Sequence, residues 1–132
     1  MKKTGTNYML SSVGDIATLG RVTLNAELAL TGSEISINEL PPTVSIPFVH
    51  SHKRNEEVYI ILRGKGQFYV DGDEFQVEEG GVIRVDPPAA RCLRADDRTA
   101  IRYICIQTEA HSLAQFTEND GVPVDAKPTW LK

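Results

Sequence analysis

Short apolar runs, separated by glycine and proline, divide the chain into candidate β-strands. Runs rich in Val, Ile, Tyr and Phe recur at intervals of about 8–12 residues, which is typical of β-sandwiches and β-barrels. The clearest local signal is Asp71-Gly72, a two-residue hairpin turn between the runs 67–70 and 73–77. This turn predicts that Phe68 lies opposite Phe75, so that one face of the hairpin is apolar and the other mostly polar.

Two further segments are predicted as strands. Residues 58–62 are apolar on both faces, as in a strand that is buried on both sides. Residues 98–106 also follow a strand pattern. Residues 25–30 could form a helical turn, but the Val, Thr and Ile around them favour a strand. We therefore expect an all-β fold.

The C-terminal part of the chain differs from the rest. Residues 112–116 could form a short helix capped by Ser112. Beyond Gly121, two prolines predict an extended arm. Trp130 is unusual in such an arm, and we expect it either to fold back on the body of the domain or to dock on a neighbouring subunit.

Length and composition indicate one globular domain. The chain has 132 residues, of which 41% are hydrophobic and 24% are charged, as in ordinary globular domains. We assign a single domain to residues 1–132, with a core over about 20–110 and a C-terminal arm over 111–132. The formal net charge of −4 argues against nucleic acid or an anionic membrane as a partner, because positive charge dominates binding to both.

The sequence predicts a cytoplasmic protein. No apolar run approaches the roughly 20 residues that span a bilayer, and the positively charged start lacks the apolar stretch of a signal peptide. A hairpin turn at 96–97 would place Cys92 opposite Ile101 rather than opposite Cys105. Both cysteines are therefore expected to be free thiols, which suits a reducing compartment.

Two histidines and a glutamate form the main candidate site. In an extended segment His50 and His52 point to the same face, with backbones about 6.6 Å apart, so both imidazoles can converge on one ion. Glu57 begins the next predicted strand and can complete a His-His-Glu set. This mixture suits one divalent ion such as Zn, Mn, Fe or Ni. The alternative is a pair of surface histidines beside a charged loop.

The same residues carry a family resemblance. The pattern His50-x-His52-x4-Glu57-x6-Gly64, preceded by Pro47, resembles the first motif of the cupin superfamily. The resemblance implies an all-β, cupin-type double-stranded β-helix, that is, a jelly-roll barrel. It also implies a small single-domain protein that commonly forms a homodimer, here through strand exchange or sheet packing near the N-terminus.

The second cupin motif is only partly matched. The run 80–88 resembles its opening, but Arg91 stands where the family places its third histidine. Arginine is permanently protonated and cannot bind a cation, so the metal site would have at most three protein ligands. Three interpretations of Arg91 remain open. It could clamp an anionic ligand through two parallel hydrogen bonds, it could take over the role of the metal, or it could pair with Glu57 or Asp86.

Two further residues are candidates for contact with substrate. Tyr59 shares a strand face with Glu57 and could act as a hydrogen-bond donor or general acid, the alternative being a core tyrosine. Gln67 lies near a strand start and could line the same site. No other residue is assigned a catalytic role.

These features predict a divalent-metal-binding cupin that acts on a small anionic metabolite. A 2-oxo acid, a sugar acid or a dicarboxylate would suit the positive charge of a metal ion beside Arg91. Isomerase, dioxygenase and decarboxylase chemistry are all compatible with the resemblance. The alternative is a non-enzymatic cupin that binds a small ligand mainly through Arg91.

Overall fold

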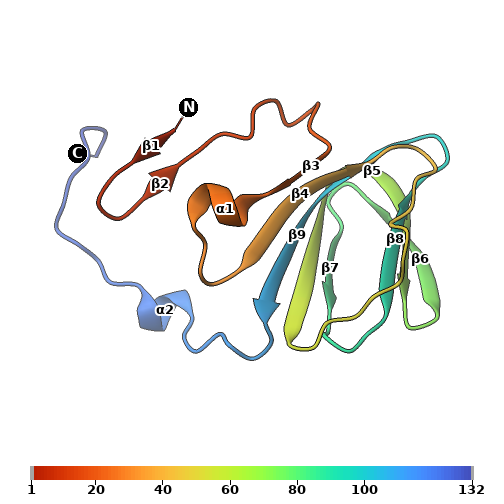
Figure 1. Ribbon diagram of the computed structural model, residues 1–132. Helices are drawn as coiled ribbons and strands as arrows, with labels where there is room; N and C mark the ends of the chain where they lie inside the picture. The colour runs from red at the N-terminus through yellow and green to blue at the C-terminus, as the bar shows by residue number, and fades with distance from the viewer. Residues whose placement is uncertain (1, 132) are drawn as a thin grey trace.

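Antiparallel strands form the barrel in the computed structural model, which describes residues 2–131 (Figure 1). Two short strands and two short helices lie outside or beside it. The barrel strands are β3 (Arg21–Thr23), β4 (Glu34–Leu40), β5 (Asn55–Val70), β6 (Asp73–Glu78), β7 (Val82–Val85), β8 (Arg91–Ala95) and β9 (Ile101–Glu109). The remaining elements are β1 (Lys3–Thr4), β2 (Met9–Leu10), α1 (Leu24–Leu28) and α2 (Thr117–Asp120).

The long strand β5 connects the two sheets of the barrel. The strand order is β3-β4-β9-β5-β6, and β7 and β8 also pair with β5. The first part of β5 pairs with β9 and β7, and its last part pairs with β6 and β8. One continuous strand therefore holds both sheets together, as expected for a jelly-roll barrel.

A β-bulge divides β5 into two halves in which the alternation of inward and outward side chains is reversed. The register against β9 shifts between Ile61 and Arg63. Tyr59 and Ile61 point into the barrel before the shift, and Phe68 points inward after it. Because an extra residue reverses the alternation of side chains, residues of the second half that share parity with Tyr59 face outward.

The core is built around aromatic side chains on the inner faces of both halves of β5. The ring of Tyr59 lies 4.9 Å from that of Phe68 and 5.8 Å from that of Tyr103, both measured between centroids. Ile61 and Leu93 are buried beside them. The prediction that 58–62 is buried on both faces is therefore correct only for the inner face, because Val58, Ile60 and Leu62 are half-buried on the outside.

The predicted hairpin is confirmed. Phe68 pairs with Phe75, and Tyr69 pairs with Glu74. Asp71 has φ 47° and Gly72 has φ 95°. Positive φ at both central residues is the signature of a type I′ turn, whose twist matches that of the flanking strands.

Two predicted local structures are wrong. Residues 25–30 are not a strand, because α1 covers Leu24–Leu28. There the Asn25 side chain donates to Ser33 O and accepts from Ile35 N, which fixes the link from helix to strand. Residues 112–116 are not helical either, and the short helix α2 begins only at Thr117. His111, with φ 66°, forms the turn that precedes this segment.

The neighbours of Cys92 also differ from the prediction. A hairpin at 96–97 does not join β8 to β9. Instead β8 pairs with β5, so that Cys92 lies opposite Tyr69. Both Cys92 and Cys105 are free thiols, as expected. Among residues 2–131, no helix has the length and apolar character needed to cross a membrane.

Replacing Gly64 with alanine is expected to destabilise the fold strongly. Gly64 has φ +79°, and a Cβ there would lie 1.8 Å from the Ala100 carbonyl oxygen. Gly80→Ala is the matched control, because Gly80 also has positive φ (+88°) but no atom within 4 Å of its Cβ position. The control should lose roughly 1–2 kcal/mol from backbone strain alone. Gly64→Ala should lose about 2 kcal/mol more in urea unfolding, and equal losses would contradict the close approach of β5 and β9.

Candidate metal centre

Backbone hydrogen bonds hold the two histidines against β8 and the turn that precedes it. His50 N donates to Arg91 O (3.2 Å), and Arg91 N donates to His50 O (2.9 Å). His52 N donates to Pro87 O at 2.8 Å. The segment before β5 is therefore tied to β8 and to the turn that precedes it, which aims both imidazoles at Glu57 on β5.

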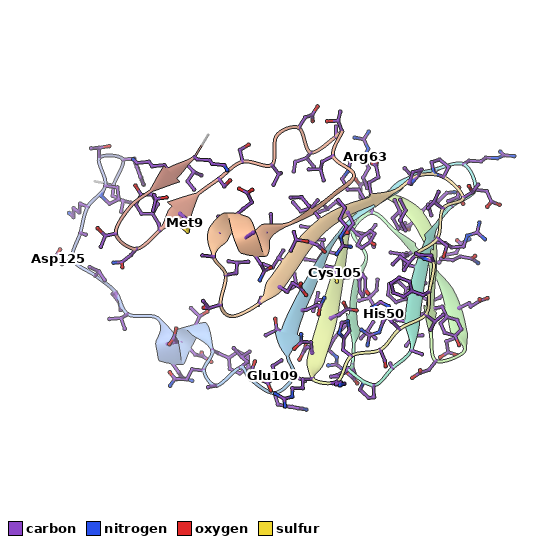
Figure 2. The ribbon with its side chains drawn as sticks, viewed as in Figure 1. Met9, His50, Arg63, Cys105, Glu109 and Asp125 are labelled. Carbon is purple, nitrogen blue, oxygen red and sulfur yellow. The ribbon has the colours of Figure 1, made fainter. Side chains whose placement is uncertain are left out.

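The three predicted metal ligands converge. Ligand atoms of His50, His52 and Glu57 all lie within 4.8 Å of one another. His52 Nε2 is 3.2 Å from Glu57 Oε2, and His50 Nε2 is 4.0 Å from Glu57 Oε1. Figure 2 labels His50 on the barrel, together with Cys105 on β9.

The histidines carry the chemistry that a metal ion requires. His52 Nε2 and His50 Nδ1 are buried and make no hydrogen bond to any group in residues 2–131. Burial lowers the pKa of His50, which favours the neutral imidazole that binds metals. A buried nitrogen without a partner is costly unless something binds it, so the residues present fit a divalent ion.

Glu57 is a buried carboxylate with several donors. Tyr59 Oη donates to Oε1 at 2.7 Å, and Arg91 Nη1 donates to the same oxygen at 2.5 Å. Cys105 Sγ donates to Oε2 at 3.3 Å. Burial alone would raise the pKa of Glu57, but the hydrogen bonds from Tyr59, Cys105 and Arg91 outweigh it, and the pKa is lowered. The carboxylate is therefore charged at neutral pH.

Arg91 is completely buried and largely occupied within the chain. Besides Glu57, its guanidinium donates from Nε to Ala89 O (3.0 Å) and from Nη2 to Asp86 O (2.7 Å) and Pro87 O (3.1 Å). Of its five N–H groups, only one on Nη1 remains for a ligand. The structure therefore shows the predicted pairing of Arg91 with Glu57. Arg91 also contacts Asp86, but through the Asp86 backbone carbonyl rather than its carboxylate. A two-bond clamp on a ligand does not fit this arrangement.

Tyr59 belongs to the site, whereas Gln67 does not join it. Burial raises the pKa of the Tyr59 phenol well above its usual value, with Cys105 and Glu57 adding to the effect, so it stays protonated and donates to Glu57. Gln67 is exposed and lies opposite Gln76 and Arg94 on the outer surface. The bulge in β5 is the reason, because it turns Gln67 to the face opposite from Glu57.

Cys105 is a site residue that the sequence did not reveal. It pairs with Tyr59 across β5 and β9 and lies opposite Ser36 on β4. Burial, together with Glu57, raises the pKa of its thiol, so it acts as a neutral donor to the carboxylate. Only the knowledge that β9 lies beside β5 places this side chain next to Glu57.

Comparisons with known proteins agree with this architecture. The cupin domain family model matches residues 36–107. The crystal structure of a cupin protein from Bacteroides fragilis has a TM-score of 0.86 and 43% identity, covering 91% of this chain and 99% of that one. A cupin-like protein from Thermotoga maritima shares the fold, with a TM-score of 0.60, 20% identity, and coverage of 69% of this chain and 68% of that one.

One curated relative also matches. It is an uncharacterised protein of Methanocaldococcus jannaschii, 27% identical over 71 residues. The match covers 54% of this chain and 57% of the relative. The chain thus spans little more than half the length of that protein.

Removing the Arg91 guanidinium is expected to destabilise the protein by about 3–5 kcal/mol, because Glu57 would be left as a buried, unpaired charge. The test is urea unfolding of Arg91→Ala in the presence of a chelator. Arg84→Ala is the control, since Arg84 pairs with Asp86 at 3.1 Å but both side chains are exposed. The control should change stability by less than about 1 kcal/mol.

A second variant separates the ion pair from simple loss of packing. Adding Glu57→Gln to Arg91→Ala removes the unpaired charge, so part of the lost stability should return. If the double variant is no more stable than Arg91→Ala, the buried pair is not the cause of the loss.

Proposed function

Since this chain belongs to the cupin domain family, we propose that it binds one divalent metal ion through His50, His52 and Glu57 and acts on a small anionic metabolite. The observation that carries the proposal is the convergence of these three ligands, with the buried His52 Nε2 making no hydrogen bond although it lies 3.2 Å from Glu57 Oε2. Zn, Mn, Fe and Ni all accept this ligand set.

The side chains around Glu57 determine which of its carboxylate oxygens can bind an ion. Glu57 Oε1 already accepts two hydrogen bonds, while Oε2 faces His52. Oε2 accepts only the Cys105 thiol at 3.3 Å, so it keeps a lone pair that can bind an ion. Tyr59 and Arg91 thus orient Glu57 and keep it charged. A bound ion would supply Lewis-acid or oxygen-activating chemistry, and three protein ligands leave positions open for substrate.

Charge supports an anionic substrate. The charges of Glu57 and Arg91 cancel, so a divalent ion beside neutral histidines leaves the site with a net charge of about +2. A 2-oxo acid, a sugar acid or a dicarboxylate would compensate this charge. Arg91 could add one hydrogen bond from Nη1. The Tyr59 hydroxyl is engaged by Glu57, so Tyr59 would orient that carboxylate rather than donate a proton to substrate.

The alternative is a non-enzymatic cupin in which Arg91 takes the place of the metal. One observation favours it: Arg91 Nη1 lies 2.5 Å from Glu57 Oε1, so a cation already neutralises the carboxylate. In that case the histidines would contact an anionic ligand directly.

Metal content distinguishes the two proposals. Protein purified without chelators is expected to carry about one metal ion per chain by elemental analysis, and His52→Ala should lose it, because two ligands hold a first-row ion weakly. His111→Ala is the matched control, since His111 is exposed and lies outside the site. The control should retain the full metal content.

A metal content near zero, with no uptake of added Zn, Mn, Fe or Ni, would overturn the metal proposal and favour the alternative. Equal metal loss in His52→Ala and His111→Ala would also contradict the three-ligand site. A screen of small anions by thermal shift would then identify what Arg91 and the histidines bind.

The charge of the preferred ligand can be tested separately. Malonate is expected to raise the Tm of metal-loaded protein, whereas malonamide, its neutral diamide of similar size, should not. At a malonate concentration of about 100 times Kd the gain in stability would be about 2.7 kcal/mol. Equal stabilisation by both compounds would exclude charge as the basis of recognition.

A further inference from the structure

Two arginines lie directly opposite each other on neighbouring strands of the sheet. Arg63 on β5 pairs with Arg102 on β9, immediately after the β-bulge. Like charges at directly opposite positions of an antiparallel pair destabilise a sheet. Glu39 on β4 forms an ion pair with Arg102 from the other side, whereas Arg63 forms no ion pair within residues 2–131. This group of side chains therefore carries one positive charge that has no counter-charge, in a chain whose formal net charge is −4.

The β-bulge brings the two guanidinium groups to the same face of the sheet. Arg63 rather than Leu62 pairs with Arg102, so Leu62 is the extra residue. In a regular register Leu62 would lie opposite Arg102, and Arg63 would turn to the inner face of the barrel. Bulges are common where a strand must direct a side chain at a functional site. The same irregularity that sets the core of β5 thus places a second arginine beside Arg102.

Arg102 is a buried guanidinium that the chain satisfies only in part. Its side chain is 10% exposed. Within the described residues its hydrogen bonds come from Nη2, which donates to Ala17 O at 2.9 Å and to Glu39 Oε1. Nε is buried and makes no hydrogen bond in residues 2–131. A buried donor without a partner is costly, and more so on a charged group, so a ligand that accepts from Nε would remove this cost.

A pocket of about 350 Å³ is lined by both arginines. We call it the arginine pocket, and its wall also includes Glu39 and Thr99, the latter from the loop between β8 and β9. Its volume lies within the range of small-molecule sites, about 300–1,000 Å³. Figure 2 shows Arg63 at the end of the barrel opposite to Glu109 and apart from His50. The arginine pocket is therefore separate from the metal centre.

The donors of the arginine pocket suit an oxyanion with several acceptor atoms. Guanidinium groups bind phosphate well, because their N–H groups form parallel hydrogen bonds to its oxygens. Arg102 offers its unpartnered Nε, the exposed Arg63 offers a whole guanidinium, and Thr99 adds a hydroxyl. A phosphate group has enough oxygens to accept from all three side chains, whereas a carboxylate has only two. One acid against two arginines in the wall also favours an anion.

We propose that the arginine pocket binds the phosphate group of a small metabolite. Arg63 and Arg102 hold the phosphate oxygens from two adjacent strands, and the phosphate supplies the missing counter-charge between them. Glu39 stays paired with Arg102 and fixes the orientation of its guanidinium. Inorganic phosphate and a phosphate monoester share this chemistry. A pocket of this volume leaves room beside a phosphate group for the rest of a small molecule, which favours the monoester.

Calorimetric titration of the full-length protein tests the proposal, with inorganic phosphate and ethyl phosphate as probes at constant ionic strength. Both should bind saturably, and ethyl phosphate at least as tightly as inorganic phosphate. Arg63→Ala should weaken both at least about tenfold, as expected for loss of a charge-assisted hydrogen bond. Arg98→Ala is the matched control, because Arg98 is also exposed and lies next to Thr99 in the chain but is not part of the wall. The control should bind both probes like the wild type.

A nuclear magnetic resonance measurement reports on Arg102 without replacing it in the protein that is titrated. The Nε–H group of Arg102 is buried, so its proton should exchange slowly with water and give a resolved side-chain signal. This signal should shift when ethyl phosphate is added, and it should shift at the same concentrations that give heat in calorimetry. Arg102→Lys, which lacks the Nε–H group, serves only to assign the signal. A signal that does not move while ethyl phosphate binds would overturn the proposal.

Three further results would overturn the proposal. The first is no saturable binding of either probe to the wild type, and the second is equal weakening in Arg63→Ala and Arg98→Ala. The third is binding that persists in Arg63→Ala and is lost in His52→Ala, which would place the anion at the metal centre. Acetate that binds as tightly as ethyl phosphate would exclude phosphate as the preferred group. Because neither arginine contacts the three metal ligands, metal content measured in parallel separates failure of this proposal from failure of the metal proposal.

Discussion

The barrel depends on one buried carboxylate and the groups that satisfy it. An ionised glutamate in an apolar interior would cost several kcal/mol without partners, and Glu57 has Arg91, Tyr59 and Cys105. Arg91 in turn donates to three carbonyl groups of the 86–89 turn. That turn accepts a hydrogen bond from His52 N. The same network therefore neutralises a charge, shapes a turn and positions a histidine, so that fold and site share one set of interactions.

Side-chain alternation along the central strands separates a polar inner face from an aliphatic outer face. Neighbouring residues such as Ser36 and Ile37, or Cys105 and Ile104, lie on opposite faces of the sheet. The inner member of each pair belongs to the polar interior around Glu57, and the outer member belongs to the half-buried aliphatic outer surface of the sheet. Since strand geometry keeps the two faces apart, a substitution on the outer face is expected to leave the ligands of the site in place.

Sequence patterns predicted what depends on local spacing. The His50, His52 and Glu57 set follows from short-range geometry, and the Asp71-Gly72 turn follows from backbone preferences. The site features that were not predicted depend on pairing between strands that are distant in the sequence. Cys105 enters the site only because β9 lies beside β5. Likewise, the partners of Arg91 are mostly backbone carbonyls, and a pattern of side chains in the sequence cannot predict such contacts.

The bulge between Ile61 and Arg63 makes β5 a strand of two halves. Within each half, side chains alternate between the inner and outer faces. The single extra residue at the bulge decides which residues of the second half face inward. A deletion of one residue there would leave Glu57 facing inward while turning Phe68 out of the core. During evolution, changes in the length of β5 should therefore be excluded at this point and be tolerated at the hairpin tip. Homologues of different length would then be expected to vary at the tip and to keep the distance from Glu57 to Phe68 constant.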